Sequence, residues 1–344
     1  MRGGFGKADR KPVLAFSYQP SLTRRVFSEA ALARLAAICD IPDPEPILDF
    51  SAARAQTLLP RINILATAWG AASIDAATLA AMPHLTLIAH GAGSVKHIVS
   101  AAVHDAGITV TNAVAANALP VADYTLACIL FANKQLFFFR DLYRDTRTAL
   151  RQHPSMESSV GNFAKTIGII GASRIGTRVI ELLKPFDFKV LLNDPYVSAQ
   201  RAAAMGVELV ELDDLLKRSD VVSLHAPALD STRNLIDARR LALLRDGATF
   251  INTARGSLVD QDAMIRELQS GRIDAFIDVT DPEVLPATSP LYELPNVFLT
   301  PHIAGAVGAE RERLGDMVVA EIERFVAGQD LRHIVAPTSL ELIA

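Results

Sequence analysis

The sequence predicts an α/β protein of two domains, each built on a parallel sheet covered by helices. Its 344 residues exceed the usual size of one domain and provide a buried core for each of two. Short apolar, β-branched runs alternate with helical segments along the chain, which is typical of parallel α/β domains. A glycine turn over residues 171–176 separates a strand pattern from a helix pattern, and it is the reference point from which the other elements are predicted.

The first third of the chain predicts a sheet domain that alternates strands and helices. We expect strands over Val13–Phe16, Ile47–Phe50, Ile62–Ala66, Leu85–Ala89 and Ile108–Thr111. Helices are expected over Phe27–Ile38, with Ser28 as N-cap, and over Ile74–Ala81. A long helix over Leu119–Arg140 follows a proline-bearing turn, and the polar segment Asp141–Asn162 is interpreted as a connector.

A second sheet domain begins at the glycine turn's own strand. Its expected strands are Thr166–Ile170, Lys189–Asn193, Val221–Leu224, Thr249–Asn252, Ala275–Val279 and Val297–Leu299. The helix expected over Gly308–Ala327 lies beyond the last of these strands, so we predict that it returns the chain to the first domain. One domain then comprises residues 1–117 and 308–344, and the other comprises residues 118–307.

Composition and charge exclude several functional classes. Half of the residues are hydrophobic and 21% are charged, as in a globular protein, and the net charge of −4 gives no case for binding nucleic acid or an anionic membrane. Cys39 and Cys128 lack the spacing of a metal site or a disulfide framework, which favours a reducing cytoplasm. No apolar run follows the basic N-terminus, so no secretion signal is expected, and the apolar segment 110–139 is too interrupted by polar residues to span a bilayer.

The glycine turn has the strand–turn–helix order of a phosphate-binding βαβ unit. At the start of the new helix, backbone N–H groups and the helix dipole would face a pyrophosphate. This predicts a Rossmann-type domain whose cofactor contacts are Gly171, Ser173, Arg174, Ile175 and Gly176. Ser173 occupies the position of the middle glycine in G-x-G-x-x-G. Its hydroxyl either weakens pyrophosphate binding or adds a ligand to it.

Asp194 follows the next strand, about 20 residues after the turn, where an acid that binds the adenosine ribose is expected. A carboxylate there accepts hydrogen bonds from both ribose hydroxyls and repels a 2′-phosphate. Residues 195–200 contain no arginine or lysine to neutralise such a phosphate, so NAD is preferred over NADP. The simpler interpretation of Asp194 is a turn acid before a proline.

Three polar side chains each follow a successive strand of the second sheet. Arg255 comes after the strand that ends at Asn252, and its planar fork suits capture of a carboxylate. Glu283 and His302 follow the next two strands, and a carboxylate near an imidazole favours the protonated ring and fixes its orientation. Such a ring is a proton donor for carbonyl reduction. The alternatives are a surface salt bridge for the arginine and a structural role for the histidine.

These motifs together resemble the D-isomer-specific 2-hydroxyacid dehydrogenases, and the resemblance covers nearly the whole chain. It rests on the glycine turn with Asp194, and on the segments Leu224–Pro227, Asn252–Gly256 with Leu258–Asp260, Asp278–Glu283 and Thr300–Ile303. The resemblance implies a Rossmann-type NAD domain, a discontinuous flavodoxin-like substrate domain, and a homodimer formed through the NAD domain. It also implies that Arg255 orients the substrate and that His302 is the acid/base, with Glu283 as its partner.

Further roles follow from the resemblance residue by residue. Asp278 is expected at the nicotinamide carboxamide, and the segments His225-Ala226-Pro227 and Thr253-Ala254 at the cofactor. The substrate carboxylate would be held by backbone N–H groups of Ala92, Gly93 and Ser94, with Asn117 in a segment lining the interdomain cleft. No metal is expected. Lys96 stands where many members carry an acid, so it either favours a more anionic substrate or faces solvent.

Two functions are compatible with these residues. The first is an NAD-dependent oxidoreductase that interconverts a 2-oxo acid and its D-2-hydroxy acid by hydride transfer, with His302 as acid/base and Arg255 orienting the substrate. The second is a non-enzymatic, NAD-sensing binding protein on the same fold, similar to the corepressors that resemble these dehydrogenases. Those proteins can keep the Arg/Glu/His set. The sequence leaves the identity of the hydroxy acid open.

Overall fold

The computed structural model describes residues 11–23, 25–150, 153–156 and 160–336, and it divides the chain into two compact units. Unit 1 comprises residues 1–117 and 306–344, and unit 2 comprises residues 118–305. Residues 1–10, on which the expectation about a secretion signal falls, lie outside the described part. Both units are parallel α/β structures, which confirms the predicted fold class.

Unit 1 is built on a four-stranded parallel sheet in the order β1-β2-β3-β4. Its strands are β1 (Leu14–Ser17), β2 (Ile64–Thr67), β3 (Leu87–His90) and β4 (Thr109–Asn112). Alternate strand residues pack on opposite faces. One face packs with α1 (Glu29–Ile38) and α12 (Arg311–Val326), and the other with α2 (Ala53–Leu58) and α4 (Ala101–Asp105), while α3 (Ala76–Ala80) has no buried residue. The predicted Ser28 N-cap is confirmed, because its side chain accepts from Ala31 N.

The strand predicted over Ile47–Phe50 is wrong. Ile47 and Phe50 are buried in the core of unit 1, but this segment has no regular secondary structure. Ile47 N donates to Phe16 O at 2.7 Å, and no ladder continues from that bond. The apolar pattern therefore reflects burial against the edge of β1 without strand pairing.

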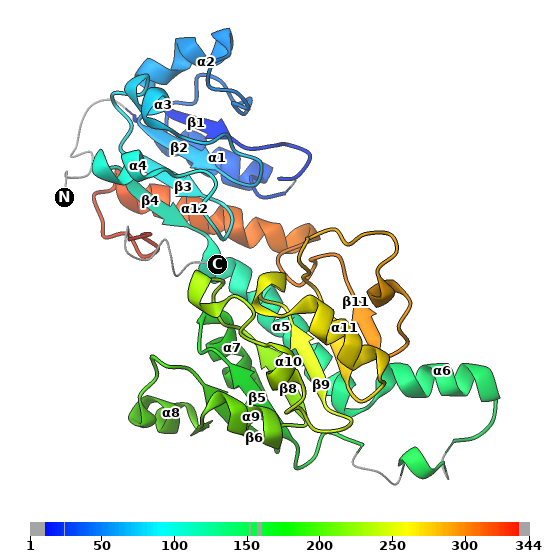
Figure 1. The fold of residues 1–344 in the computed structure, drawn as a ribbon. Helices are drawn as coiled ribbons and strands as arrows, with labels where there is room; N and C mark the ends of the chain where they lie inside the picture. The colour runs from blue at the N-terminus through cyan, green and yellow to red at the C-terminus, as the bar shows by residue number, and fades with distance from the viewer. Residues whose placement is uncertain (1–10, 24, 151–152, 157–159, 337–344) are drawn as a thin grey trace. The chain divides into compact units, whose positions relative to one another are not determined.

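Unit 2 is built on a seven-stranded parallel sheet in the order β11-β10-β9-β8-β5-β6-β7 (Figure 1). The strands are β5 (Thr166–Ile170), β6 (Lys189–Asn193), β7 (Glu208–Leu209), β8 (Val221–Leu224), β9 (Thr249–Asn252), β10 (Asp274–Ile277) and β11 (Val297–Leu299). Six of them were predicted, and the two-residue β7 was not. The strand predicted over Ala275–Val279 is observed as Asp274–Ile277, so its predicted end is wrong: Asp278 and Val279 lie in the loop that follows β10.

Helices cover both faces of this sheet, which explains why its strands are nearly continuous apolar runs. Val222, Phe250 and Ile277 face a core formed with α9 (Leu212–Arg218), α10 (Ala238–Leu241) and α11 (Gln261–Gln269). The neighbouring residues on each strand face a second core, formed with α5 (Val114–Asn133), α7 (Arg174–Leu183) and α8 (Ala199–Met205).

The single helix predicted over Leu119–Arg140 is two helices. Helix α5 begins at Val114 and contains Pro120 in its interior, and α6 spans Leu136–Thr146. They separate at Gln135, which has a left-handed φ of 47°. Figure 1 shows α6 extending away from the sheet of unit 2, so the first part of the predicted polar connector is helical.

Among the described residues, α5 is the one helix long and apolar enough to cross a membrane. Its residues Ala122, Cys128 and Ile129 pack in the core of unit 2, as in the core helix of a globular domain. Length and composition are therefore weak evidence for a membrane span, and the absence of one stays a prediction.

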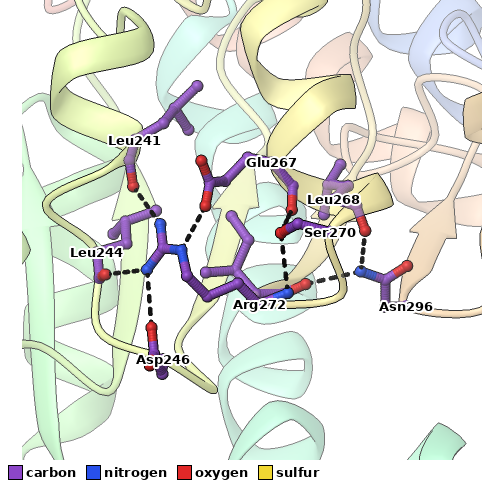
Figure 2. Close-up of polar contacts among 9 residues, drawn as sticks. Leu241, Leu244, Asp246, Glu267, Leu268, Ser270, Arg272 and Asn296 are labelled. Carbon is purple, nitrogen blue, oxygen red and sulfur yellow. Dashed lines mark hydrogen bonds and ion pairs between the residues drawn. The ribbon is translucent and has the colours of Figure 1, made fainter.

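Arg272 joins the helix ends that precede β9 and β10 (Figure 2). Its Nη2 donates to Leu241 O at 2.8 Å, Nη1 donates to Leu244 O, and Nε donates to a carboxylate oxygen of Glu267. Asn296 continues the network by donating to Leu268 O at 2.9 Å and to Ile273 O at 2.7 Å. The last carbonyls of α10 and of the turn after it thereby gain partners that a helix end otherwise lacks.

Replacing Arg272 with alanine is expected to lower the free energy of unfolding by about 3 kcal/mol, because two carbonyls and one carboxylate lose their donor. Urea denaturation measures this loss. The control is Arg178→Ala, which removes an exposed ion pair with Glu181 and is expected to cost less than about 1 kcal/mol. Equal losses in both variants would contradict the role assigned to Arg272.

Candidate active site

The glycine turn joins β5 to α7 at the carboxyl end of the sheet in unit 2. Gly171 has φ of 94°, and a Cβ there would lie 2.8 Å from Ala226 N. At Gly176 a Cβ would collide with Gly171 O, so the helix can pass this close only without a side chain. Both predicted glycine positions are therefore required by close backbone approach.

Ser173 is the N-cap of α7. Its Oγ accepts the Gly176 N–H at 3.3 Å, which uses the hydroxyl to satisfy the first turn of the helix. The serine thus contributes a cap that the glycine of the usual pattern would not. No acceptor in the described part of the chain faces the N–H groups of Ser173, Arg174 and Ile175.

Asp194 lies next to this turn at the end of β6. One carboxylate oxygen accepts Ala172 N at 2.7 Å, and the other accepts Tyr196 N at 2.8 Å. The carboxylate is therefore fixed beside the turn by two main-chain donors and keeps further lone pairs for ribose hydroxyls.

The donor set of unit 2 fits a dinucleotide. The N–H groups of the N-cap and of the first two helical residues, which meet no acceptor among the described residues, provide what a pyrophosphate needs, and the fixed acid provides what an adenosine ribose needs. His225 adds an orphaned polar atom, because the residue is 3% exposed and its Nδ1 has no hydrogen-bond partner among the described residues, while Nε2 contacts Ser223 Oγ at 2.9 Å. The other predicted cofactor residues lie just past β8 and β9, where Ala226, Thr253 and Ala254 are buried and Pro227 is half-buried.

Arg255 lies just past β9, half-buried, with Nη1 donating to Ala254 O at 2.6 Å. Burial lowers the pKa of its guanidinium, and the charge of Glu283 opposes this. The backbone around Arg255 is held by Asn252, whose Oδ1 accepts Ala254 N and whose Nδ2 donates to Arg255 O, both at 3.0 Å. Asn252 lies in a motif of the sequence analysis, but no role was predicted for its side chain. An asparagine at a strand end, able to bond both flanks of a turn, was the available signal.

The loop that carries Arg255 packs against the loop that carries Glu283. A Cβ at Gly256 would collide with the main chain of Thr280 and Asp281. Thr280 Oγ1 is placed between Pro282 O at 2.9 Å and Glu283 O at 3.0 Å. The arginine and glutamate segments are therefore mutually positioned by backbone contact.

Glu283 and His302 form the predicted pair, with Glu283 Oε1 2.5 Å from His302 Nδ1. Both side chains are partly exposed, so the pair contributes little to folding stability and mainly orients the ring. Because Nδ1 is bound to the carboxylate, Nε2 is the ring nitrogen that can exchange a proton with another molecule.

Asp278 is buried and bonded to its own chain. Its carboxylate accepts the Thr300 hydroxyl at 2.7 Å and the main-chain N–H groups of Ile303 and Ala304 at 2.8 and 2.9 Å. The predicted contact with a nicotinamide carboxamide would have to use its remaining lone pairs.

The predicted carboxylate-binding loop of unit 1 follows β3. Two of its carbonyls accept hydrogen bonds from the end of β4 and the residue after it. Ala113 N donates to Ala92 O and Asn112 Nδ2 donates to Gly93 O, both at 3.0 Å. In contrast, the N–H groups of Ala92, Gly93 and Ser94 meet no acceptor in the described part of the chain. The loop therefore has its donors available, as an anion site requires.

Asn117 joins the two sequence segments that form unit 1, because it ends the first segment and bonds to the first residue of the second. Its Oδ1 accepts Ala306 N at 3.0 Å, so its amide oxygen has a structural use, and its Nδ2 has no hydrogen bond to the described residues. Lys96 is exposed. Among the described residues no cluster of His, Cys, Asp or Glu could hold a metal ion.

Two buried histidines make folding sensitive to acid. Burial lowers the pKa of His90 to about 4, opposed by hydrogen bonding to the Ser94 main chain, and burial lowers the pKa of His225 to about 3. Both rings are neutral in the fold, whereas the unfolded chain binds protons below about pH 6.5. Stability is therefore complete above pH 6.5 and is lost as the pH falls toward these folded-state values.

Between pH 7.5 and 5.5 we expect unfolding to become easier by on the order of 3 kcal/mol, about half from each histidine. Urea denaturation at the two pH values measures this. The exposed His84 serves as a control, since His84→Asn should leave the pH dependence as it is. Stability that stays constant over this range would contradict the neutral state of the buried rings.

The geometry of unit 2 defines a dinucleotide-binding α/β domain with an Arg/Glu/His set near the carboxyl ends of its strands. Residues 126–304 match the family described as D-isomer specific 2-hydroxyacid dehydrogenase, NAD binding domain. The chain belongs to this family, and its cofactor is a nicotinamide dinucleotide.

Relatives in this family carry different substrate names. D-3-phosphoglycerate dehydrogenase of Mycobacterium tuberculosis is 36% identical over 264 residues, which are 75% of this chain and 48% of that protein. Glyoxylate reductase of Korarchaeum cryptofilum is 33% identical over 257 residues, 74% of this chain and 77% of that protein. The chain thus spans about half the length of the phosphoglycerate dehydrogenases it matches.

Solved structures show the same fold. D-mandelate dehydrogenase of Rhodotorula graminis has a TM-score of 0.80 at 23% identity and covers 95% of this chain and 98% of its own. A phosphoglycerate oxidoreductase from Rhizobium etli has a TM-score of 0.77 at 25% identity, with 94% and 98% coverage. At these identities the likeness to the first concerns the fold alone.

Proposed function

We propose that the protein is an NAD-dependent oxidoreductase that interconverts a 2-oxo acid and its D-2-hydroxy acid. The observation that carries this is the Glu283–His302 pair, which leaves Nε2 able to exchange a proton, in the unit that holds the dinucleotide turn. Arg255 supports it, because its loop packs on the loop of Glu283.

Each residue has a definite task in this proposal. When bound, NADH supplies a hydride to the substrate carbonyl carbon. Arg255 binds the carboxylate and polarises the carbonyl oxygen, and its half-buried position strengthens that attraction. His302 gives its Nε2 proton to the developing hydroxyl, and Glu283 holds the ring through Nδ1.

The substrate carboxylate is also assigned to the N–H groups of Ala92, Gly93 and Ser94. What supports this is that the carbonyls of Ala92 and Gly93 are bonded within unit 1, whereas the three donors meet no acceptor among its described residues. Orienting the carboxylate with fixed donors converts an encounter into an aligned pair. Asn117 Nδ2 is the further donor that we assign to the substrate.

NAD is proposed over NADP because Asp194 is fixed beside the turn by Ala172 N and Tyr196 N. A carboxylate held in this position accepts the ribose hydroxyls and repels a 2′-phosphate. The other cofactor contacts are assigned to the turn itself, to Asp278, and to the segments 225–227 and 253–254.

We further propose a cytoplasmic homodimer that forms through unit 2. The apolar side chains Phe131, Leu136, Phe138 and Tyr143 are exposed on α5 and α6, and two buried free cysteines are compatible with a reducing compartment. Light scattering of the purified chain tests the dimer, and Phe138→Glu should shift it toward the monomer.

The test of the proposed activity is NADH oxidation by the full chain against glyoxylate, hydroxypyruvate, phosphohydroxypyruvate and bulkier 2-oxo acids, repeated with NADPH. We expect turnover of at least one acid, a D-configured product wherever the hydroxy acid formed is chiral, and faster reaction with NADH. NADH binding without turnover of any acid would instead favour the NAD-sensing binding protein.

A further inference from the structure

We propose that Tyr124 and Thr300 are positioning residues, which form a hydrogen-bond chain that holds the His302 loop through Asp278. The chain runs from Tyr124 Oη to Thr300 Oγ1 at 2.8 Å and from Thr300 Oγ1 to Asp278 Oδ1 at 2.7 Å. All four residues lie in unit 2. The importance of this chain for the reaction rests on the proposed function of His302.

The His302 loop needs external support because its backbone is unfavourable. His302 has φ of 55°, a left-handed conformation that residues with a side chain rarely adopt. Such a conformation persists only when the surrounding structure determines it.

Asp278 alone accepts hydrogen bonds from three successive main-chain N–H groups of the His302 loop. Its main-chain oxygen accepts His302 N at 2.9 Å, and its two carboxylate oxygens accept the next two N–H groups, of Ile303 and Ala304. The successive N–H groups of Ile303 and Ala304, next to a left-handed residue, bind the carboxylate as an anion site does, and here the anion is internal to the protein. The carboxylate of Asp278 therefore fixes the main chain of the histidine.

Donors and acceptors in this hydrogen-bond chain can be assigned in only one direction, from Tyr124 to Asp278. As a carboxylate, Asp278 can only accept, so the one hydroxyl hydrogen of Thr300 is donated to it. Tyr124 must then be the donor to Thr300. Burial raises the pKa of Tyr124 to about 12, which keeps its hydroxyl protonated and able to donate.

Each donor strengthens the next bond. A hydroxyl that accepts a hydrogen bond becomes a better donor, so Tyr124 strengthens the bond from Thr300 to the carboxylate. Tyr124 belongs to α5, whose neighbouring residues pack in the core of unit 2. The chain therefore ties the exposed, strained histidine loop to a rigid helix, as precise placement of a proton donor requires.

The test compares Thr300→Val, Tyr124→Phe and Thr300→Ser in the full chain. Thr300→Val keeps the side-chain shape and removes the donor to Asp278, so we expect kcat to fall about 10- to 100-fold, the range of a small misplacement of a reacting group. Tyr124→Phe removes only the upstream donor and should lower kcat roughly 3- to 10-fold. Thr300→Ser restores the hydroxyl and should recover kcat to within about threefold of the wild type.

Two further measurements separate positioning from general stability. The dissociation constant for NADH should change less than about threefold, because the turn at 171–176 and Asp194 are untouched and Asp278 keeps its carboxylate and two main-chain donors. In the protein without cofactor, amide hydrogen exchange over residues 302–304 should accelerate at least about tenfold in Thr300→Val. Ser219→Ala is the matched control, since it removes another buried hydroxyl of unit 2, bonded to Leu215 O at 2.7 Å, and should change neither kcat nor this exchange.

The proposal is overturned if Thr300→Val keeps kcat within about twofold of the wild type and leaves exchange at 302–304 unchanged. It is equally overturned if Thr300→Ser loses as much kcat as Thr300→Val, because the hydroxyl would then be irrelevant. Should the wild type turn over no acid, the proposed function fails, and the exchange measurement still decides whether the chain holds the loop. Tyr124→Phe keeps the test open if Thr300→Val does not fold.

Discussion

Replacing His302 with alanine is expected to lower kcat about 10²- to 10⁴-fold, the range that general acid–base catalysis contributes. Glu283 orients the His302 ring through Nδ1, and Nε2 is then the nitrogen that exchanges a proton with the substrate. NADH binding should persist, because the turn and Asp194 keep their own hydrogen bonds. Stopped-flow kinetics and fluorescence titration with NADH measure the two quantities separately.

Two matched variants sharpen this result. Glu283→Gln keeps a hydrogen-bond acceptor near Nδ1 and removes the charge, so its loss of kcat should be smaller than that of His302→Ala. The exposed His84→Ala should leave kcat unchanged. A His302→Ala enzyme with kcat within about tenfold of the wild type would assign the proton transfer to another group.

Replacing Gly256 with alanine is expected to lower kcat/KM at least about 100-fold. The new methyl group would collide with the main chain of Thr280 and Asp281, so the loops that carry Arg255 and Glu283 must move apart. Because the obstacle is backbone, no side-chain rotation relieves it. A displacement of about 1 Å between reacting groups costs on the order of 10²-fold in rate.

Gly247→Ala is the control for this substitution. Gly247 has φ of 75° with open space around it, so alanine there should cost about 1 kcal/mol of stability and leave kcat/KM intact. Steady-state kinetics and thermal unfolding on both variants separate the effects. If both substitutions reduced only stability, contact between the two loops would not matter for the site.

The sequence could predict those strands whose side chains alternate between two buried faces. Five of the strands expected after residue 160 coincide with the observed ones, and in β5, β8 and β9 the apolar runs reflect burial under helices on both sides. Ile47–Phe50 has the same apolar pattern, yet it meets the sheet through one main-chain bond. Apolar spacing reports burial, whereas pairing depends on a neighbour distant in sequence.

The predicted helix boundaries were wrong where core packing outweighed a local sequence preference. Pro120 is normally a helix boundary, but α5 begins at Val114 and continues through it. The break at Gln135 has no proline or glycine to announce it, since a glutamine there adopts a left-handed φ. Packing of α5 in the core of unit 2 outweighs these local preferences.

For the site, sequence order was sufficient to place Arg255, Glu283 and His302 after successive strands, and Glu283 and His302 do meet. The supporting residues were not predictable in the same way. Asn252, Thr300 and the bonded state of Asp278 depend on loop conformations with a left-handed residue and close backbone approach. Motif spacing does not encode such conformations.

The interruption of unit 1 in sequence has a consequence for how the chain is made. Helix α12 covers the sheet face that contains Leu14, Phe16 and Leu87, yet it emerges from the ribosome only after all of unit 2. At 5–20 residues per second this leaves that apolar face covered by α1 but without α12 for roughly 10–40 s. Unit 2 can complete its core within this interval, so nascent chains stalled before residue 311 should be bound by chaperones at the N-terminal sheet.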